Sequence, residues 1–386
     1  MHLYLNRSIF NQLNKFKKKA LVFYMTDLDM EEIKELLEEF PFKQDKEIIT
    51  KILEMEISQK DLIRSLHFSL PLFSLAVLNK RFERNKKLVE KEWARAKVKK
   101  LDDIGTVKQL KIIPLIDFRG ESNLSTESGV SYYIKADDIG ILFDTGINSK
   151  DEHPSPLLKN MEVLGITLED FNYVFISHLH GDHVGGDKWE ENKTFSLSGM
   201  QQDLNHVRAF TPVSMSHPTA TVSQVNDAEV ITKGIASIGP IKNPMFFAGL
   251  TTEHALALNV EGKGIVIIVG CGHQGIQKII DRVEALFDTP IYGIIGGLHL
   301  PIPKFPGDEG TWAGLPVFKF IMTRRPPWEP WNENDRKDVI EYLKARNLKL
   351  VALSPHDSSS ESIDAFKKTF KEAYVDIMVG KTIEIS

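Results

Sequence analysis

The chain has 386 residues, of which 42% are hydrophobic and 26% charged, and its formal net charge is −5. These values are close to the averages of soluble globular proteins and exclude a mainly disordered chain. The negative balance gives no electrostatic case for a nucleic-acid partner, which usually shows as a basic domain. Cys271 is the only cysteine, which excludes an intramolecular disulfide framework and favours a reducing compartment. We therefore expect a cytoplasmic protein of two or three domains.

The first part of the chain, residues 1–105, carries helix signals and little glycine, and we predict a helical N-terminal extension. It would act as a cap or mediate a homo-oligomer. A second interpretation is attachment to a membrane surface through the uncharged stretch 65–79 and the basic run 80–87. That stretch is shorter than the roughly 20 apolar residues a membrane span needs, so stable insertion is not expected. A charged helix is predicted to follow Pro71 and to run to about Lys100.

From about Leu110 onward, the residue pattern changes to short β-branched runs, glycine turns and amphipathic helices. One helix is predicted over Gln274–Phe287, and another begins at a capping box of Ser358 and Glu361 and runs to about Ala373. Strands that come first and then alternate with helices predict a layered α/β domain over residues 106–386. The runs that predict strands are residues 111–118, 130–135, 140–143, 173–176, 264–269, 291–295 and 348–353.

Residues 301–331 hold seven of the 18 prolines and three of the five tryptophans and show no helical or strand periodicity. Loops of this length are usually functional or disordered. Because the tryptophans argue against disorder, we predict a lid loop or a substrate wall. Within it, Arg324 would recognise a phosphate group and Trp328 would stack on a flat heterocycle. The alternative is a solvated loop whose indoles pack on the domain.

The sharpest local signal is the segment 177–183, which reads SHLHGDH and follows a predicted strand. His178 and His180 can reach one metal ion if the chain stays extended. Asp182 and His183 follow a glycine that permits a sharp turn, so they would face a second ion a few ångströms away. Two ions at roughly 3.5–4 Å clamp an attacking water, and these ligand types suit zinc, iron or manganese.

This segment resembles the HxHxDH signature of the metallo-β-lactamase fold superfamily, and the FDTG sequence around Asp144 is similar to its early aspartate motif. The order of the segments 270–276 (GCGHQGI), 296–300 (GGLHL) and 353–357 (LSPHD) is similar to the dihydropterin synthase-like branch. The resemblance implies an αββα sandwich over residues 106–386, preceded by the helical extension. It also implies that Asp144 lies beside the metals and orients the histidines that bind them.

Further site residues are implied by the same resemblance. His356 stands where the last metal histidine of the superfamily lies, and His273 is the preferred additional ligand of the first ion. Cys271 replaces the usual bridging aspartate and is expected beside the metals, where a thiolate is a competent soft ligand. His254 or Glu253 are the alternatives at the position of the isolated central histidine. His299 would contact a metal or donate a proton to a leaving group.

The chemistry expected from these residues is metal-dependent hydrolysis. Two divalent ions, with zinc preferred over iron or manganese, would activate water against an ester or phosphate ester of a small, phosphorylated substrate. Asp182 would orient the water and His299 would stabilise the leaving oxygen. The branch implies one alternative, a transferase that joins a dihydropterin to a ribofuranosylaminobenzene phosphate and releases diphosphate. A non-catalytic metal-binding or redox protein on the same fold is the third interpretation.

Overall fold

The computed structural model describes residues 71–302 and 324–386, so the first seventy residues of the predicted extension and most of the predicted lid lie outside the described residues. The described chain forms two compact units. The first contains residues 71–95, 244–250 and 324–330, and the second contains residues 96–243, 251–302 and 331–386. In the first unit, helix α5 (Pro71–Arg95) ends five residues before the predicted Lys100.

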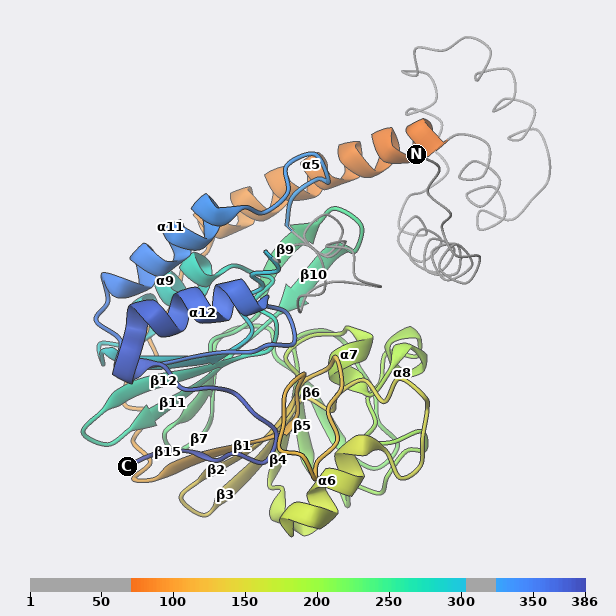
Figure 1. The fold of residues 1–386 in the computed structure, drawn as a ribbon, viewed down its shortest axis with the longest axis vertical. Coiled ribbons are helices and arrows are strands. Elements are labelled where there is room, and N and C mark those ends of the chain that lie inside the picture. The colour runs from red at the N-terminus through yellow and green to blue at the C-terminus, as the bar shows by residue number, and fades with distance from the viewer. Residues whose placement is uncertain (1–70, 303–323) are drawn as a thin grey trace, which may run out of the picture. The chain divides into compact units, whose positions relative to one another are not determined.

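The second unit is built on two large sheets that are antiparallel in part and parallel in part (Figure 1). The seven-stranded sheet has the order β15-β1-β2-β3-β4-β5-β6, with the bounds Ile383–Ile385, Leu110–Ile116, Ser131–Ala136, Ile139–Phe143, Tyr173–Phe175, Arg208–Thr211 and Thr221–Gln224. The six-stranded sheet has the order β14-β13-β12-β11-β8-β7, with the bounds Leu350–Leu353, Ile291–Gly296, Gly264–Val269, Leu256–Val260, Ile235–Ser237 and Glu229–Thr232. Strands β9 (Ile241–Met245) and β10 (Gly249–Glu253) form a separate ribbon.

The two sheets share one apolar core. Phe143 and Phe175 of the seven-stranded sheet belong to the same buried cluster as Leu256 and Val266 of the six-stranded sheet. Every residue of β12 is buried, and this strand pairs in parallel with β13. A continuous apolar run is what a parallel strand covered on both faces requires. The sheets therefore pack face to face, as the resemblance noted in the sequence implied.

Helices cover the outer faces of this sandwich. Helix α6 (Pro156–Leu164) contacts β1, and its Leu157 and Met161 join a second apolar cluster behind the seven-stranded sheet. Over the other sheet lie α9 (Ile276–Leu286), α11 (Glu333–Lys344) and α12 (Ser360–Phe370), as Figure 1 shows. The short helices are α7 (Gly181–Val184), α8 (Asp187–Glu191), η1 (Leu168–Asp170) and η2 (Lys371–Ala373). The layers are thus helix, sheet, sheet, helix.

The predicted boundaries shift where side chains bind the backbone locally. The strand predicted to Phe118 ends at Ile116, since the Asp117 carboxylate accepts the Phe118 backbone N–H at 2.7 Å and replaces a strand contact. Helix α12 is capped by Ser359 and not by the predicted Ser358: the Ser359 hydroxyl accepts the Ser362 backbone N–H. The Ser358 hydroxyl donates instead to the Asp357 carboxylate at 2.9 Å. One residue of offset thus separates the predicted cap from the observed one.

The arrangement of parallel strands decides where the loops meet. Strands β12, β13 and β14 run parallel as neighbours, so the loops that follow them leave from one edge of the six-stranded sheet. The loop after β4 reaches the same place from the other sheet, because His178 forms an isolated bridge with Glu253. The carboxyl ends of parallel strands are where loops carry functional groups in many α/β proteins. The residues predicted to bind metal all follow these strands.

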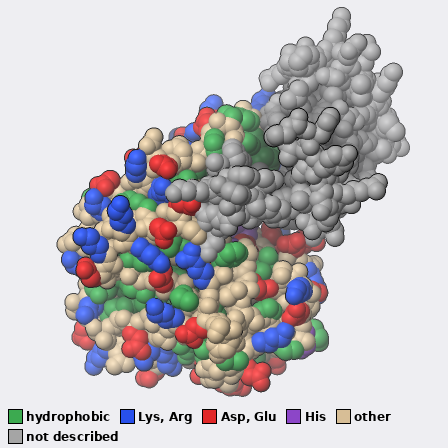
Figure 2. Space-filling model, in the orientation of Figure 1, with side chains coloured by type: hydrophobic (Ala, Val, Ile, Leu, Met, Phe, Trp, Pro, Cys, Tyr) green, Lys and Arg blue, Asp and Glu red, His purple; other side chains and the backbone are tan. Residues whose placement is uncertain are grey.

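The surface of the described residues carries acidic and basic side chains side by side on the face shown in Figure 2. None of the described helices combines the length and the apolar character that crossing a membrane requires.

Candidate metal centre

The segment after β4 has the two-part conformation that its sequence predicts. His180 is extended, with φ −121° and ψ 150°, and it is the N-cap of α7, which begins at Gly181 and carries Asp182 and His183. Gly181 packs against Asp187, whose backbone nitrogen would lie 3.0 Å from an added Cβ. A side chain would therefore be crowded at the turn that separates the two histidines from the Asp182–His183 pair.

His178 and His180 point ring nitrogens at one another, with 3.0 Å between His178 Nε2 and His180 Nδ1. The rings of His178 and His180 each lie 4.9 Å from the ring of His273, measured between centroids. Burial and the neighbouring histidines hold the pKa of His178 well below its ordinary value, and burial lowers the pKa of His180 to about 4. Both rings are therefore neutral at pH 7 and keep a lone pair for a metal ion.

A second group consists of Asp182, His183, Cys271 and His356, whose ligand atoms lie within 4.8 Å of one another. His356 Nε2 lies 3.1 Å from Asp182 Oδ2. Burial opposes ionisation of Asp182, but the adjacent His183 and His356 rings lower the pKa of its carboxyl below its ordinary value. Asp182 is therefore a carboxylate at neutral pH, with its side chain 26% exposed.

Asp144 orients His183 of this second group through a buried contact with its ring. Its backbone has φ +57°, in the left-handed region. One carboxylate oxygen accepts the Ser177 backbone N–H at 2.7 Å, and the other lies 2.7 Å from both the Ser177 hydroxyl and His183 Nδ1. Burial works against a charged His183, but Asp144 and Asp182 raise the pKa of its ring to about 9. The Asp144 contact turns His183 Nε2 toward the remaining ligands, as expected for a carboxylate that positions a metal histidine.

Glu253 holds the loop that carries Cys271 and His273. Its carboxylate accepts three backbone N–H groups, from Cys271 at 3.1 Å, Gly272 at 2.9 Å and His273 at 2.8 Å. Burial raises the pKa of Glu253 to about 7, although these amide contacts favour the charged form. Glu253 was one alternative for a metal ligand. The structure uses its oxygens to shape the ligand loop instead.

His254, the other alternative, has no ring nitrogen left for a metal. Its Nε2–H donates to the Ile176 carbonyl at 2.9 Å, and its Nδ1 lies 2.9 Å from the Ser237 hydroxyl. The ring stacks on Phe175 at 4.0 Å between centroids. Burial lowers the pKa of His254 to about 3. His254 is a neutral core residue that joins the two sheets.

His299 follows β13 and has φ +52°, a backbone conformation that few non-glycine residues adopt. Its backbone N–H donates to Asp357 Oδ2 at 2.9 Å, and its Nδ1 lies 3.9 Å from the same oxygen. Its ring lies 4.6 Å from the His273 ring. Asp357, the residue after His356, therefore holds His299 beside His273 of the first group.

His356 is anchored from the core side by a buried network. Its backbone N–H donates to the Ser354 hydroxyl at 3.2 Å, and that hydroxyl donates to Asp117 Oδ2 at 2.8 Å. Tyr132 donates to the same oxygen at 2.8 Å. Burial raises the pKa of Asp117, and His356 opposes that rise. The network fixes the loop after β14 at the position from which His356 Nε2 faces Asp182.

Arg324 and Trp328, the predicted substrate contacts, belong to the other compact unit. There Trp328 is 55% exposed and lies edge-on to Phe246, with 5.3 Å between centroids. Their contact with a substrate stays a prediction.

The residues present fit a pair of divalent ions. Both ring nitrogens of His273 are buried and have no hydrogen-bond partner among the described residues, although a buried polar atom normally finds one. Imidazoles beside a carboxylate and a thiol form a donor set for a borderline metal such as zinc or iron. His178, His180 and His273 would hold one ion, and Asp182, His183 and His356 would hold the other.

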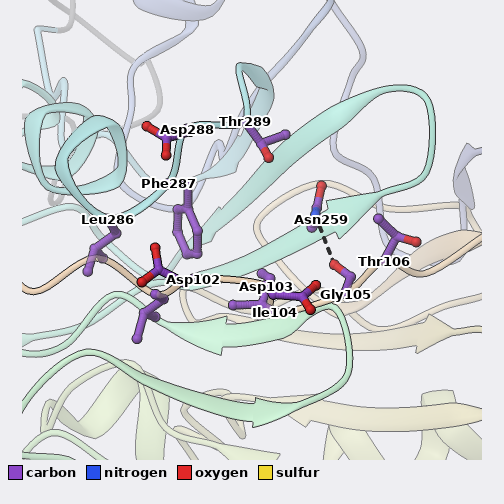
Figure 3. A pocket seen from close by; sticks show the side chains of 11 residues that line it. Asp102, Asp103, Ile104, Gly105, Thr106, Asn259, Leu286, Phe287, Asp288 and Thr289 are labelled. Carbon is purple, nitrogen blue, oxygen red and sulfur yellow. Dashed lines mark hydrogen bonds between the residues drawn. The ribbon is translucent and has the colours of Figure 1, made fainter.

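A separate cavity of about 270 Å³ lies elsewhere in this unit (Figure 3). It is lined by residues 101–106 and 286–289 and by Asn259, whose side-chain amide donates to the Gly105 carbonyl at 2.8 Å. Asn259 pairs with Ile265 near the start of β12, whereas the metal-binding loops follow the end of that strand. The cavity is thus not part of the candidate metal centre.

Comparison with known proteins agrees with this fold. Residues 125–195 match the family model of the metallo-beta-lactamase superfamily. The structure is similar to the crystal structure of a metal-dependent hydrolase of the beta-lactamase superfamily, with a TM-score of 0.51 at 20% identity over 72% of this chain and 99% of that chain. The likeness to this solved structure is one of fold, and the family model matches the part of the chain that holds the histidine segment.

The chain is also similar in sequence to a curated relative. The chain is 27% identical over 243 residues to the 7,8-dihydropterin-6-methyl-4-(beta-D-ribofuranosyl)-aminobenzene-5'-phosphate synthase of Methanocaldococcus jannaschii, a match that covers 52% of this chain and 81% of the relative. This similarity agrees with the dihydropterin synthase-like order of segments found in the sequence.

Four residues of the site were not singled out from the sequence for the roles that the structure gives them: Ser177, Asp117, Tyr132 and Asp357. Ser177 directly precedes the histidine segment, and Asp357 directly follows His356, so adjacency to a ligand was an available signal. Asp117 directly follows β1 and Tyr132 lies on β2, and nothing in the local sequence marks either residue. Asp117 accepts hydrogen bonds from both Tyr132 and Ser354, and its contact with Ser354 depends on how the two sheets pack.

Proposed function

We propose that the protein is a metal-dependent hydrolase that cleaves an ester or phosphate ester of a small molecule. It would hold two divalent ions, of which zinc is the preferred candidate. The observation that carries the proposal is the convergence of four overlapping groups of ligand atoms on loops from both sheets. When bound, the ions would lower the pKa of water and supply the nucleophile for such a cleavage. Loss of His180 is expected to abolish both metal uptake and turnover.

The chain's own residues have distinct tasks in this proposal. Asp182 is ionised and partly exposed, so it would accept a hydrogen bond from the attacking water and orient it. His299, held by Asp357, would donate a proton to the leaving oxygen. Asp144 would keep His183 turned toward its ion. Arg324 and Trp328 would bind a phosphate and a flat ring of the substrate.

A transferase is the second candidate, favoured by the similarity to the pterin synthase over 81% of that relative. In this case, the same ions would stabilise the negative charge on a departing diphosphate. A pterin ring would suit an exposed tryptophan such as Trp328. For both candidates we propose a small-molecule substrate and not a nucleic acid, because the net charge of the chain is −5. On the single cysteine, we place the protein in the cytoplasm, with the N-terminal helices joining copies of the chain.

The test combines metal analysis with two assays. Protein purified without added metal or chelator is analysed for zinc, iron and manganese, and about two ions per chain are expected. A panel of esters and phosphodiesters is then compared with an assay for diphosphate release from a dihydropterin diphosphate. The variant His180→Ala should lose both metal uptake and turnover, while His217→Asn, at a buried histidine outside the ligand groups, should keep both. Full activity of His180→Ala would refute the proposal.

A further inference from the structure

Two of the three histidines in the histidine segment are oriented by one shared network. The Ser177 hydroxyl donates to the Asp144 carboxylate at 2.7 Å and lies 3.0 Å from His178 Nδ1. The same carboxylate lies 2.7 Å from His183 Nδ1. In both rings Nδ1 is the nitrogen that is held, which leaves Nε2 to face the metal positions. The ring of His180 has a different partner.

That partner is Thr251 of strand β10, whose Oγ1 lies 3.4 Å from His180 Nε2. The contact follows from an antiparallel pairing, in which His178 is bridged to Glu253. Two steps forward along one segment correspond to two steps back along the other, so His180 lies opposite Thr251. Residues two apart on an extended chain share a face, and opposite residues on that face are neighbours.

Strand β10 turns one face toward the metal centre. Thr251 is 6% exposed and Glu253 is fully buried, whereas Thr252 between them is partly exposed. On the buried face, Glu253 holds the loop that carries His273, and Thr251 contacts His180. The strand belongs to the separate ribbon and to neither large sheet. The ribbon thus gives the first ligand group contacts that come from outside the sandwich.

The direction of the contact follows from what a metal ligand needs. His180 Nδ1 faces His178 Nε2 at 3.0 Å, inside the first ligand group. A neutral imidazole carries one N–H, and the nitrogen that binds a metal must be bare. If His180 binds through Nδ1, its proton is on Nε2 and needs an acceptor. A threonine hydroxyl can accept it, and the second nitrogen of a metal-binding histidine is usually held by such a partner.

We propose that Thr251 is a positioning residue of the metal centre: its hydroxyl accepts the Nε2–H of His180 and thereby turns Nδ1 toward the first metal position. The inference rests on the metal centre of the proposed function and adds a residue that acts through a ligand without touching the metal. Without the hydroxyl, the ring of His180 can rotate and its proton can move to Nδ1. The first metal position should then be weakened.

The first measurement is the zinc affinity of full-length variants, by competition with a chelator. Thr251→Val keeps the shape of the side chain and removes the hydroxyl, so zinc should bind about tenfold more weakly. Thr251→Ser keeps the hydroxyl and should bind zinc as the wild type does. Thr252→Val makes the same change on the other face of the strand and should leave the affinity unchanged. A Thr251→Val variant with the zinc affinity of the wild type would overturn the inference.

The second measurement reads the His180 ring directly, by NMR of metal-free protein labelled with nitrogen-15 in its 12 histidines. The variant His180→Gln identifies the signal. The wild type should carry the proton on Nε2 and exchange it slowly with solvent, and exchange should be faster in Thr251→Val and slow again in Thr251→Ser. A general loss of packing would also alter the signal of His217. A wild-type proton on Nδ1 would overturn the inference, since Thr251 would then donate and not accept.

The two proposals can fail separately. Weakened zinc binding and faster exchange in Thr251→Val, in a protein that turns over neither esters, phosphodiesters nor a dihydropterin diphosphate, would refute the proposed function and leave the role of Thr251 standing. An active wild type whose zinc affinity and exchange are the same in Thr251→Val would refute the role of Thr251 alone.

Discussion

His254 offers a quantitative test of how the core beside the metal centre is built. Burial lowers its pKa from 6.5 to about 3, so the folded protein resists a proton that the unfolded chain accepts below pH 6.5. Stability from the neutral ring is complete above pH 6.5 and is lost as the pH falls toward 3. Each pKa unit corresponds to about 1.4 kcal/mol, so the full effect is about 5 kcal/mol. Between pH 6.5 and 5 the loss is about 2 kcal/mol.

The variant His254→Gln cannot titrate and should lack this share of the acid sensitivity. It should be less stable than the wild type at pH 7, because Gln loses the stacking on Phe175. That difference should shrink by about 2 kcal/mol at pH 5. The measurement is urea unfolding of both proteins at the two pH values. Chelator-treated protein is used because metal affinity itself depends on pH.

Two results would refute the reasoning about His254. One is an unchanged difference between variant and wild type across the pH range, which would mean that the ring is not excluded from protonation. The other is loss of a metal ion from the variant under conditions in which the wild type binds two. The second result would mean that His254 is a metal ligand, which contradicts the hydrogen bonds of both its ring nitrogens with Ile176 and Ser237. His217→Gln should retain its metal in the same experiment.

Two further changes probe the carboxylates that shape the site. Glu253→Gln places an amide N–H against the backbone N–H of His273, which should cost about 1–3 kcal/mol of folding stability and weaken zinc binding. Urea unfolding measures the stability, and competition with a chelator measures the zinc affinity. An unchanged zinc affinity would contradict the role of Glu253 in holding the loop. Asp357→Asn should lower turnover about tenfold for esters with poor leaving groups and less for nitrophenyl esters, since it weakens the positioning of His299 as a proton donor. An equal loss on both kinds of ester would show that Asp357 acts on something other than the leaving group.

The parts of the fold that follow from local pattern were predictable. The apolar run of β12 and the one-sided apolar face of α9 gave these elements at nearly their observed bounds. The extended histidines and the turn at Gly181 followed from the spacing within seven residues. The predicted boundaries were wrong where neighbouring side chains compete for the same backbone group, as at the helix cap, which is Ser359 and not Ser358.

The contacts between distant segments could not be predicted in the same way. Cys271 and His183 are 88 residues apart, and their contact depends on how β12 of one sheet faces β4 of the other. His254 and Glu253 are neighbours in the sequence, and only the alternation of side chains across a strand end sends one to the core and the other to the ligand loop. Sequence alone left both as equal alternatives, because ligand chemistry does not distinguish a buried hydrogen bond from a metal bond.

The pairing of β15 with β1 has a consequence for synthesis of the protein. Leu110 pairs with Ile385, so the seven-stranded sheet keeps an open edge at β1 until the last described strand has left the ribosome. An open edge can pair with another chain. The loop that carries His356 also emerges late, after the histidine segment at 177–183. A nascent chain would therefore hold its first histidines for many residues before it could complete a metal centre, which makes metal loading a late event in the life of the polypeptide.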